Sequence, residues 1–174
     1  MSDTRTLATQ YVRQICLKRQ EVGSFEVYPF SLQAVRTLDE LEMHPKVTFF
    51  VGENGSGKST LLEALAISLR FNPEGGSRNF NFGTRQSHSE LHQHLRVVKG
   101  IRRPRDGYFL RAESFFNVAT EIENLGVDFA YGDARLHEQS HGESFMALLL
   151  NRFRGNGLYL LDEPEAALSP QRQF

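Results

Sequence analysis

One nine-residue loop constrains this chain more than any other part of its sequence. Residues 52–60 read GENGSGKST, a run with three glycines followed by lysine, serine and threonine. A β-branched and aromatic run, KVTFFVG (46–52), precedes the loop and predicts a buried strand that stops abruptly. The sequence KSTLLEALAISLRF (58–71) follows, with leucine and alanine at helical spacing. A strand, a tight glycine turn and an amphipathic helix in this order predict an α/β domain.

The residue types of the 52–60 loop suit the binding of phosphate groups. The loop matches the pattern G-x-x-x-x-G-K-[ST] at every fixed position. Glycines let successive backbone N–H groups converge on an anion, and the following helix adds its N-terminal dipole. Lys58 would supply a point charge for the β- and γ-phosphates, and the Ser59 hydroxyl would be a ligand of Mg²⁺. The predicted nucleotide-binding residues of the loop are Gly52, Glu53, Asn54, Gly55, Ser56, Gly57, Lys58, Ser59 and Thr60.

A second chemical motif follows an apolar run near residue 160. The sequence LYLLDEPE (158–165) predicts a buried strand that delivers two carboxylates to the end of a sheet. Ligands of α/β proteins bind at the carboxyl ends of the strands. Asp162 would therefore hold Mg²⁺, and Glu163 would act as the general base that polarises the attacking water.

The remaining patterns predict one globular domain with a flexible tail at 1–10. Of the 174 residues, 40% are hydrophobic and 24% are charged, which is ordinary for a domain with its own core. We expect strands at 11–19 and 25–35, a polar insertion at 72–107, a strand that becomes helical at 108–125, an apolar helix at 143–153, and a strand followed by a turn at 157–170. Pro29 marks the second strand as an edge or a bulge.

Charge and composition exclude some partners. The net charge of −1 gives no global attraction for nucleic acid, although Lys99, Arg102, Arg103 and Arg105 form a basic loop that would be either a solvated turn or a weak nucleic-acid contact. The single cysteine, Cys16, indicates a reducing compartment, and no apolar run is long enough to span a bilayer. We expect a cytoplasmic protein without membrane insertion.

Together, GENGSGKST, LLDEPE and the following AALSP (166–170) resemble ABC-type P-loop ATPases of the soluble, SMC/RecF-like or stand-alone branch. The resemblance covers residues 11–174. It implies a P-loop NTPase fold with a mainly parallel sheet, helices and an N-terminal antiparallel β portion. It also implies ATP and Mg²⁺ as cofactors, Lys58 and Glu163 as catalytic residues, and an ATP-dependent homodimer that acts on a protein partner. The family carries a switch histidine on a later strand, so we expect the C-terminal strands to be missing here.

The stretch ARLHEQSHGESF (134–145) supports two different chemistries. His137, Glu138 and His141 have the H-E-x-x-H spacing of a zinc site, but Gly142 would weaken the helix that must hold both histidines. The same place in ABC-type ATPases carries a signature motif that binds the γ-phosphate of the opposite subunit. The resemblance therefore implies that Ser140 and Gly142 bind nucleotide in trans.

Weaker signals leave several roles open. Glu113 stands where the family has a glutamine that senses Mg²⁺, and Gln86 is a poorer candidate. Either Tyr28 or Phe30 would stack on adenine. A zinc centre at the three histidines 88, 92 and 94 competes with a solvated polar loop. The alternatives to an ATPase cycle are a non-hydrolysing ATP switch or degenerate fragment and the nucleotide-binding subunit of a membrane transporter.

Overall fold

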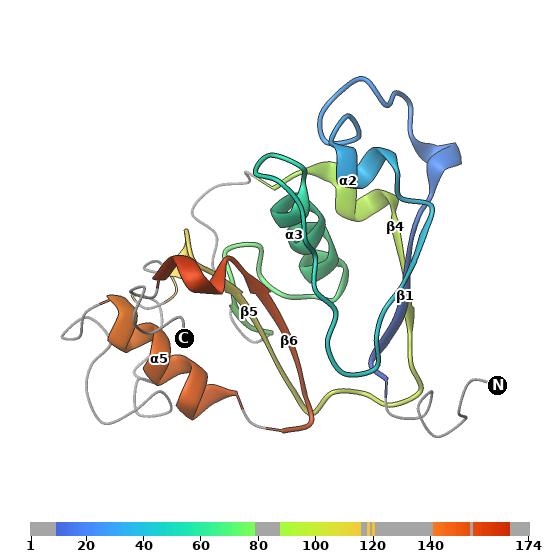
Figure 1. The fold of residues 1–174 in the computed structure, drawn as a ribbon. Coiled ribbons are helices and arrows are strands. Elements are labelled where there is room, and N and C mark those ends of the chain that lie inside the picture. Colours follow the sequence, from blue (N-terminus) through green and yellow to red (C-terminus); the bar gives the residue numbers. More distant parts are fainter. Residues whose placement is uncertain are drawn as a thin grey trace. The chain divides into compact units, whose positions relative to one another are not determined.

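The computed structural model describes residues 10–78, 88–115, 118, 120, 141–153 and 155–167 (Figure 1). The chain forms two compact units. The first unit comprises Met1–Arg70 and Arg85–Pro104, and the second comprises Phe71–Thr84 and Arg105–Phe174. The 52–60 loop belongs to the first unit, and the Asp162–Glu163 pair belongs to the second.

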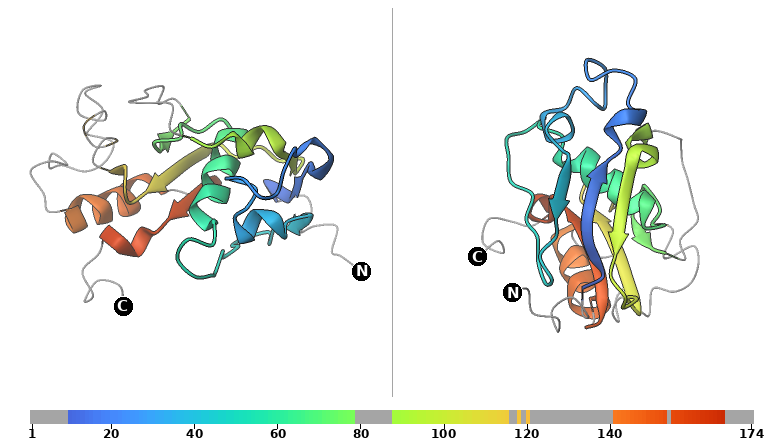
Figure 2. Two further views of the ribbon diagram at one scale, coloured as in Figure 1. Left: turned by 90° about the horizontal axis from the view of Figure 1, so that it is seen from above. Right: turned by 90° about the vertical axis from the view of Figure 1, so that its right-hand side faces the viewer.

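The first unit contains a three-stranded antiparallel sheet. Strand β1 (Val12–Leu17) lies between β2 (Glu40–Glu42) and β4 (Leu95–Lys99), and the right-hand view of Figure 2 shows the three strands side by side. Ile15 pairs with Leu41 on one side and with Val97 on the other. Ile15 is fully buried, which is typical of the central strand of a sheet with one face on the core.

Helix α3 (Lys58–Ser68) carries the 52–60 loop on its N-terminus. Its buried side chains are Leu61, Leu62, Ala64, Leu65 and Ala66. The helix packs against β4, the short helix α2 (Gln33–Arg36) and the 3₁₀ helix η2 (Glu90–His94). Glu63 Oε1 accepts the Ser89 backbone N–H at 3.3 Å. The Ser68 hydroxyl donates to the Ala64 carbonyl of the same helix at 2.8 Å and also lies 3.3 Å from the His92 carbonyl. The helix that follows the 52–60 loop is thus anchored to the core of its unit.

The second unit is built on strand β5 (Asp106–Arg111), whose residues 107–110 are all buried. Strand β5 pairs antiparallel with β3 (Gly76–Ser77) and parallel with β6 (Gly157–Asp162). In the β5–β6 pair, Arg111 is the register partner of Asp162. Helix α5 (His141–Arg152) is fastened to β5 because Arg152 donates a hydrogen bond to Asp106, which also accepts from the Tyr159 hydroxyl.

Two predicted strands are wrong. In the 25–35 stretch the backbone forms turns closed by Ser31 N–H to Val27 O and Leu32 N–H to Pro29 O, and α2 begins at Gln33. Pro29 has no N–H to donate to a sheet, which favours the turn. The 46–52 stretch forms no strand either, because no strand of the described residues pairs with it.

Other predicted elements agree in type and differ at their ends. The predictions of a strand at 11–19, a helix at 58–71 and a helix at 143–153 correspond to β1, α3 and α5. The predicted strand and turn at 157–170 correspond to β6 followed by the 3₁₀ helix η5 (Pro164–Ala167), within the described part. The described residues of the predicted insertion at 72–107 contain β3, η2 and β4. Within the ranges that the structure describes, no helix is long and apolar enough to cross a membrane.

Candidate functional site

The 52–60 loop turns sharply at two glycines with positive φ. Gly55 has φ 80°, and Gly57, at the N-terminus of α3, has φ 100°. This conformation is costly for residues with a Cβ, so glycine is required for geometric reasons. At Gly57 there is a second reason, because an added Cβ would lie 3.0 Å from the Leu32 Cβ. The turn therefore brings the backbone N–H groups at the start of α3 to the loop, which is the arrangement that binds phosphate oxygens.

Lys58 is held over this loop by two backbone carbonyls. Its Nζ donates to Gly52 O and to Glu53 O, each at 2.8 Å. Both bonds are solvent-exposed, so the ammonium group remains accessible to an anion. Ser59 and Thr60 follow in the first turn of α3 and are half-buried. The loop thus gathers a cation, a hydroxyl and a helix N-terminus in one place.

Asp162 ends strand β6 and Glu163 follows it, and the two carboxylates lie in different environments. Asp162 is 7% exposed, whereas Glu163 is exposed. Glu163 has φ 50°, a left-handed conformation that is uncommon outside glycine, and its carbonyl accepts the Ala166 N–H at 3.0 Å. The chain therefore turns at Glu163 and directs its carboxylate to solvent at the carboxyl end of β6.

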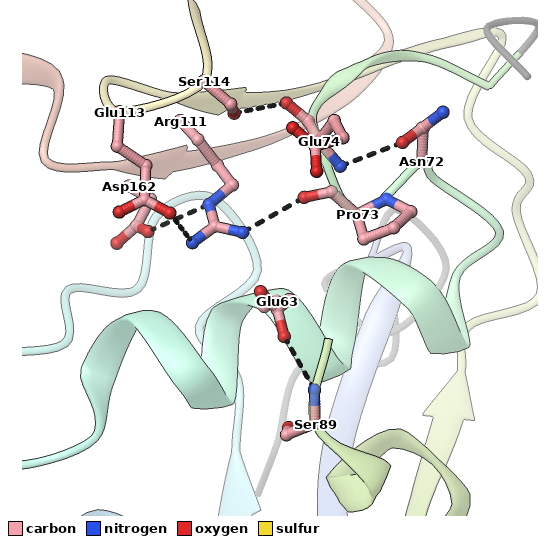
Figure 3. Close-up of polar contacts among 9 residues, drawn as sticks. All are labelled: Glu63, Asn72, Pro73, Glu74, Ser89, Arg111, Glu113, Ser114 and Asp162. Atoms are coloured by element: carbon pink, nitrogen blue, oxygen red, sulfur yellow. Dashed lines mark hydrogen bonds and ion pairs between the residues drawn. The ribbon is translucent and has the colours of Figure 1, made fainter. Parts of the chain in front are cut away.

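Sequence reasoning missed Arg111, which contacts the buried carboxylate. Its Nε lies 3.7 Å from Asp162 Oδ2, its Nη1 donates to the Pro73 carbonyl at 3.2 Å, and its Nη2 pairs with Glu113 Oε1 (Figure 3). Only 13% of the Arg111 side chain is exposed, against 74% for Glu113. The sequence FLR (109–111) places an arginine at the end of a predicted strand. Its contact with Asp162 could not be predicted, because it depends on the register of β5 with β6.

The Glu113 segment is held on its other side by the loop that follows α3. The Ser114 hydroxyl donates to the Glu74 carbonyl, and Glu74 N–H donates to Asn72 Oδ1 at 2.9 Å (Figure 3). Glu113 was predicted to take the place of a Mg²⁺-sensing glutamine, and the structure shows its carboxylate paired with Arg111. Its segment and the end of β6 thus lie together in the second unit.

The other predicted site residues either lie outside the described residues or belong to other elements than the 52–60 loop and the end of β6. Ser140, Gln86, His137 and Glu138 lie outside the described residues. Gly142 lies in the first turn of α5, which begins at His141. Phe30 is buried and packs edge-on against His94, so Tyr28 is the exposed member of the pair proposed to stack on adenine.

The zinc centre at histidines 88, 92 and 94 is not formed. His92 Nδ1 is 3.0 Å from the Ser89 carbonyl, and the His94 ring packs on Phe30. Among the described residues no group of three histidine, cysteine, aspartate or glutamate side chains could hold a metal ion. His92 thus contacts a backbone carbonyl and the ring of His88, and His94 contacts Phe30, around η2.

The residues predicted to hold Mg²⁺ fit that ion in their chemistry. Ser59 and Asp162 offer oxygen donors, which Mg²⁺ prefers over nitrogen or sulfur. The buried Asp162 carboxylate oxygen Oδ2 lies 3.7 Å from Arg111 Nε, and this nearby cation offsets part of the cost of burying the carboxylate. Ser59 belongs to the first unit and Asp162 to the second.

Comparisons with known proteins identify related sequences. A family model described as "AAA domain" matches residues 20–126. The chain is also similar to the DNA replication and repair protein RecF of Colwellia psychrerythraea (strain 34H / ATCC BAA-681), with 68% identity over 25 residues. That match spans 14% of this chain and 7% of the RecF protein. No solved structure matches the chain.

Proposed function

The chain belongs to the AAA domain family as a P-loop ATPase of the RecF/SMC type, and from this premise we propose that it binds Mg·ATP and hydrolyses it in an ABC-type cycle. The observation that carries the proposal is the geometry of the 52–60 loop. Two glycines with positive φ and a lysine held over the loop form a site suited to phosphate. In the cycle, ATP would close two copies of the chain into a dimer and hydrolysis would open it.

The proposal gives each site residue a separate task. The backbone N–H groups of 52–60 and the Lys58 ammonium would bind the phosphates, and the Ser59 hydroxyl and the Asp162 carboxylate would hold Mg²⁺. The bound ion would neutralise the charge that develops on the phosphate oxygens. The exposed Glu163 would orient the attacking water and accept its proton. Ser140 and Gly142 would contact the nucleotide held by the second copy.

The overall arrangement of the domain is part of the same proposal. The parallel pairing of β5 with β6 supports a mainly parallel sheet in a single ABC-type domain, with β1, β2 and β4 as its antiparallel portion. The cytoplasmic location predicted from the single cysteine stays a prediction.

The test is the solution mass of the full chain by light scattering, with and without Mg·ATP. We expect Glu163→Gln to trap ATP and to shift from monomer to dimer, because the base is lost while the shape of the site is kept. Glu165→Gln, which changes an exposed carboxylate two residues away, is the matched control and should show no trapped dimer.

Three results would count against the proposal. If Glu163→Gln binds ATP as a monomer, the dimer-forming cycle is wrong and a monomeric ATP switch is favoured. If the chain binds no ATP, or if Lys58→Ala binds it as well as the wild type, the assignment of the 52–60 loop is wrong.

A second proposal concerns the process coupled to ATP. The relative named above is a DNA replication and repair protein by name, and Lys99, Arg102, Arg103 and Arg105 are all exposed. We infer weak DNA binding by this basic loop, because phosphate contacts by exposed arginine and lysine are sequence-independent. Fluorescence anisotropy with a duplex oligonucleotide should show binding that weakens steeply with salt. Binding that the Arg102→Ala, Arg103→Ala double variant leaves unchanged would exclude this loop.

A further inference from the structure

Arg111 lies beside Asp162, but the proposed ATPase cycle gives it no task. It ends β5, directly opposite Asp162 in the parallel β5–β6 pair. Its guanidinium is in contact with two carboxylates and one carbonyl, from Asp162, Glu113 and Pro73 (Figure 3). All of these groups belong to the second unit. The cation therefore lies against the carboxylate to which Mg²⁺ binding has been assigned.

The two carboxylate partners of Arg111 are not equivalent. The Asp162 side chain is 9% exposed and lies 3.7 Å from Nε, beyond hydrogen-bond distance. The Glu113 side chain is 74% exposed and accepts a hydrogen bond from Nη2. Arg111 therefore has a loose ion pair with the buried carboxylate and a direct bond to the exposed one. Its guanidinium could leave Asp162 without losing Glu113.

The positive charge of Arg111 opposes the binding of a divalent cation at Asp162. A guanidinium and a divalent cation repel each other, and in a partly buried site this repulsion is weakly screened. Both are attracted to the same Asp162 carboxylate. Arg111 must therefore move away from Asp162, or weaken its hold, before that carboxylate can bind a divalent cation strongly.

We propose that Arg111 is a positioning residue that competes with the divalent cation for Asp162 and is retained by Glu113 when the cation binds. The inference rests on the proposed role of Asp162 in the nucleotide site. Arg111 partly offsets the charge of the Asp162 carboxylate when no cation is bound, and Glu113 supplies the alternative partner. Cation binding at Asp162 is thereby linked to the 112–115 segment that follows β5.

The proposal predicts opposite effects for the substitution of Arg111 and for the substitution of Glu113. Arg111→Met removes the competitor, so half-saturation with Mg²⁺ should need a lower Mg²⁺ concentration. Glu113→Gln removes the alternative partner, so Arg111 should hold Asp162 more tightly and the required Mg²⁺ concentration should rise. We expect each shift to be at least roughly threefold, the scale of a partly exposed ion pair.

The experiment is a Mg²⁺ titration of the full chain at fixed concentration of a fluorescent ATP analogue, followed by equilibrium anisotropy. Arg13→Met is the matched control, because Arg13 is an exposed arginine on β1 in the other unit, and its titration should equal the wild type. A purely structural role of Arg111 would lower analogue binding at all Mg²⁺ concentrations without lowering the midpoint.

A double variant separates the competition from direct cation binding by Glu113. If Glu113 acts through Arg111, then Glu113→Gln has no further effect on the midpoint when Arg111 is already Met. A persisting increase would mean that Glu113 itself holds the cation or its water, and the competition would be wrong. If Arg111→Met does not fold, the exposed Glu113→Gln still decides, because an unchanged or lowered midpoint overturns the proposal.

One further readout completes the test. In urea denaturation without nucleotide or Mg²⁺, Arg111→Met and Asp162→Asn should be non-additive, since each removes the same pair. Additive effects would show that the pair is not formed, which contradicts the proposal. Failure of the wild type to bind the analogue at any Mg²⁺ concentration would instead refute the proposed function, whereas Mg²⁺-dependent binding with equal midpoints in all variants would refute only the role of Arg111.

Discussion

Lys58 shows how a single side chain can matter for binding and little for folding. Its two hydrogen bonds to the Gly52 and Glu53 carbonyls are exposed, so water can replace them at small cost. A phosphate group, in contrast, would form a charge-assisted bond with the same ammonium. We predict that Lys58→Met changes the free energy of unfolding by less than about 0.5 kcal/mol.

The same change should weaken ATP binding by roughly 10- to 100-fold, the value of a hydrogen bond to a charged group. Isothermal titration calorimetry with urea denaturation measures both quantities. The control is Lys46→Met, which removes an exposed lysine of the same unit and should leave both unchanged. Equal ATP affinity in Lys58→Met and wild type would contradict the prediction.

The glycines of the loop allow backbone strain to be separated from steric overlap. Gly55→Ala meets nothing within 4 Å and pays only for its positive φ, so we predict a loss of about 1 kcal/mol in the free energy of unfolding. Gly57→Ala has a similar φ and also meets Leu32, so its loss should be larger, about 2–3 kcal/mol. Urea denaturation measures both. Adding Leu32→Ala should rescue part of the Gly57→Ala loss and none of the Gly55→Ala loss, and equal losses at the two glycines would contradict the steric argument.

At the scale of elements, one charged cluster fastens helix α5 to β5. Burial by itself raises the pKa of Asp106. Hydrogen bonds from Arg152, the Gly107 N–H and Tyr159, together with the charge of Arg152, lower it by more. The pKa of Asp106 therefore lies below its usual value of 3.8. A lowered pKa in the folded state means that the ionised form stabilises the fold. This stabilisation is fully present above the usual value and is lost as the pH falls through the lowered pKa.

We therefore predict that Asp106→Asn lowers the stability of the chain at pH 7 by about 1–2 kcal/mol. The difference from wild type should stay constant down to about pH 5 and shrink below about pH 4, where the wild-type carboxylate becomes protonated. Urea denaturation across this pH range measures the difference. Asp39→Asn, at an exposed ion pair with Arg19, is the control and should cost less than about 0.5 kcal/mol. A difference that grows on acidification would contradict the sign of the argument.

At residues 46–52, before the glycine loop, the sequence predicts a buried strand, whereas the structure shows a mostly exposed segment without a strand. A buried strand at 46–52 would make Phe49→Ser cost about 3–5 kcal/mol. In the structure Phe49 is 82% exposed, and Val47 and Val51 are also exposed. We therefore predict a change below about 0.5 kcal/mol in urea denaturation. Leu65→Ala in the buried face of α3 is the positive control and should cost about 2–5 kcal/mol. A large loss with Phe49→Ser would mean that the segment is buried after all.

One physical reason explains which features could be predicted from the sequence and which could not. Helix α3 was predictable because its hydrogen bonds and its apolar face lie within one stretch of sequence. A strand needs a partner from elsewhere, and an apolar run such as KVTFFV does not say which partner it has. Arg111 was missed for the same reason, since its contact with Asp162 depends on the pairing of β5 with β6. Residues 52–60 and 162–163 could be proposed from sequence because their chemistry is local.

At the scale of the whole molecule, the motifs are divided between the two units. The loop with Lys58 and Ser59 belongs to the first unit, whereas Asp162, Glu163 and Arg111 belong to the second. If Ser59 and Asp162 are both ligands of Mg²⁺, as proposed, then Mg·ATP must stabilise elements of both units. ATP without a divalent cation should act mainly through the 52–60 loop, because Asp162 then has no cation to bind.

Amide hydrogen exchange followed by mass spectrometry measures this difference in the full chain. We predict that ATP with EDTA slows exchange in α3, whereas Mg·ATP slows exchange in α3 and also in β5 and β6. The free energy of opening should rise by up to about 2.7 kcal/mol at a ligand concentration 100 times Kd. Asp162→Asn should abolish the additional protection of β5 and β6 and retain the protection of α3 by ATP. Lys58→Ala should weaken both. Protection of α3 alone by Mg·ATP in the wild type would contradict a role of Asp162 in binding the nucleotide, because opening of β6 would then not release the ligand.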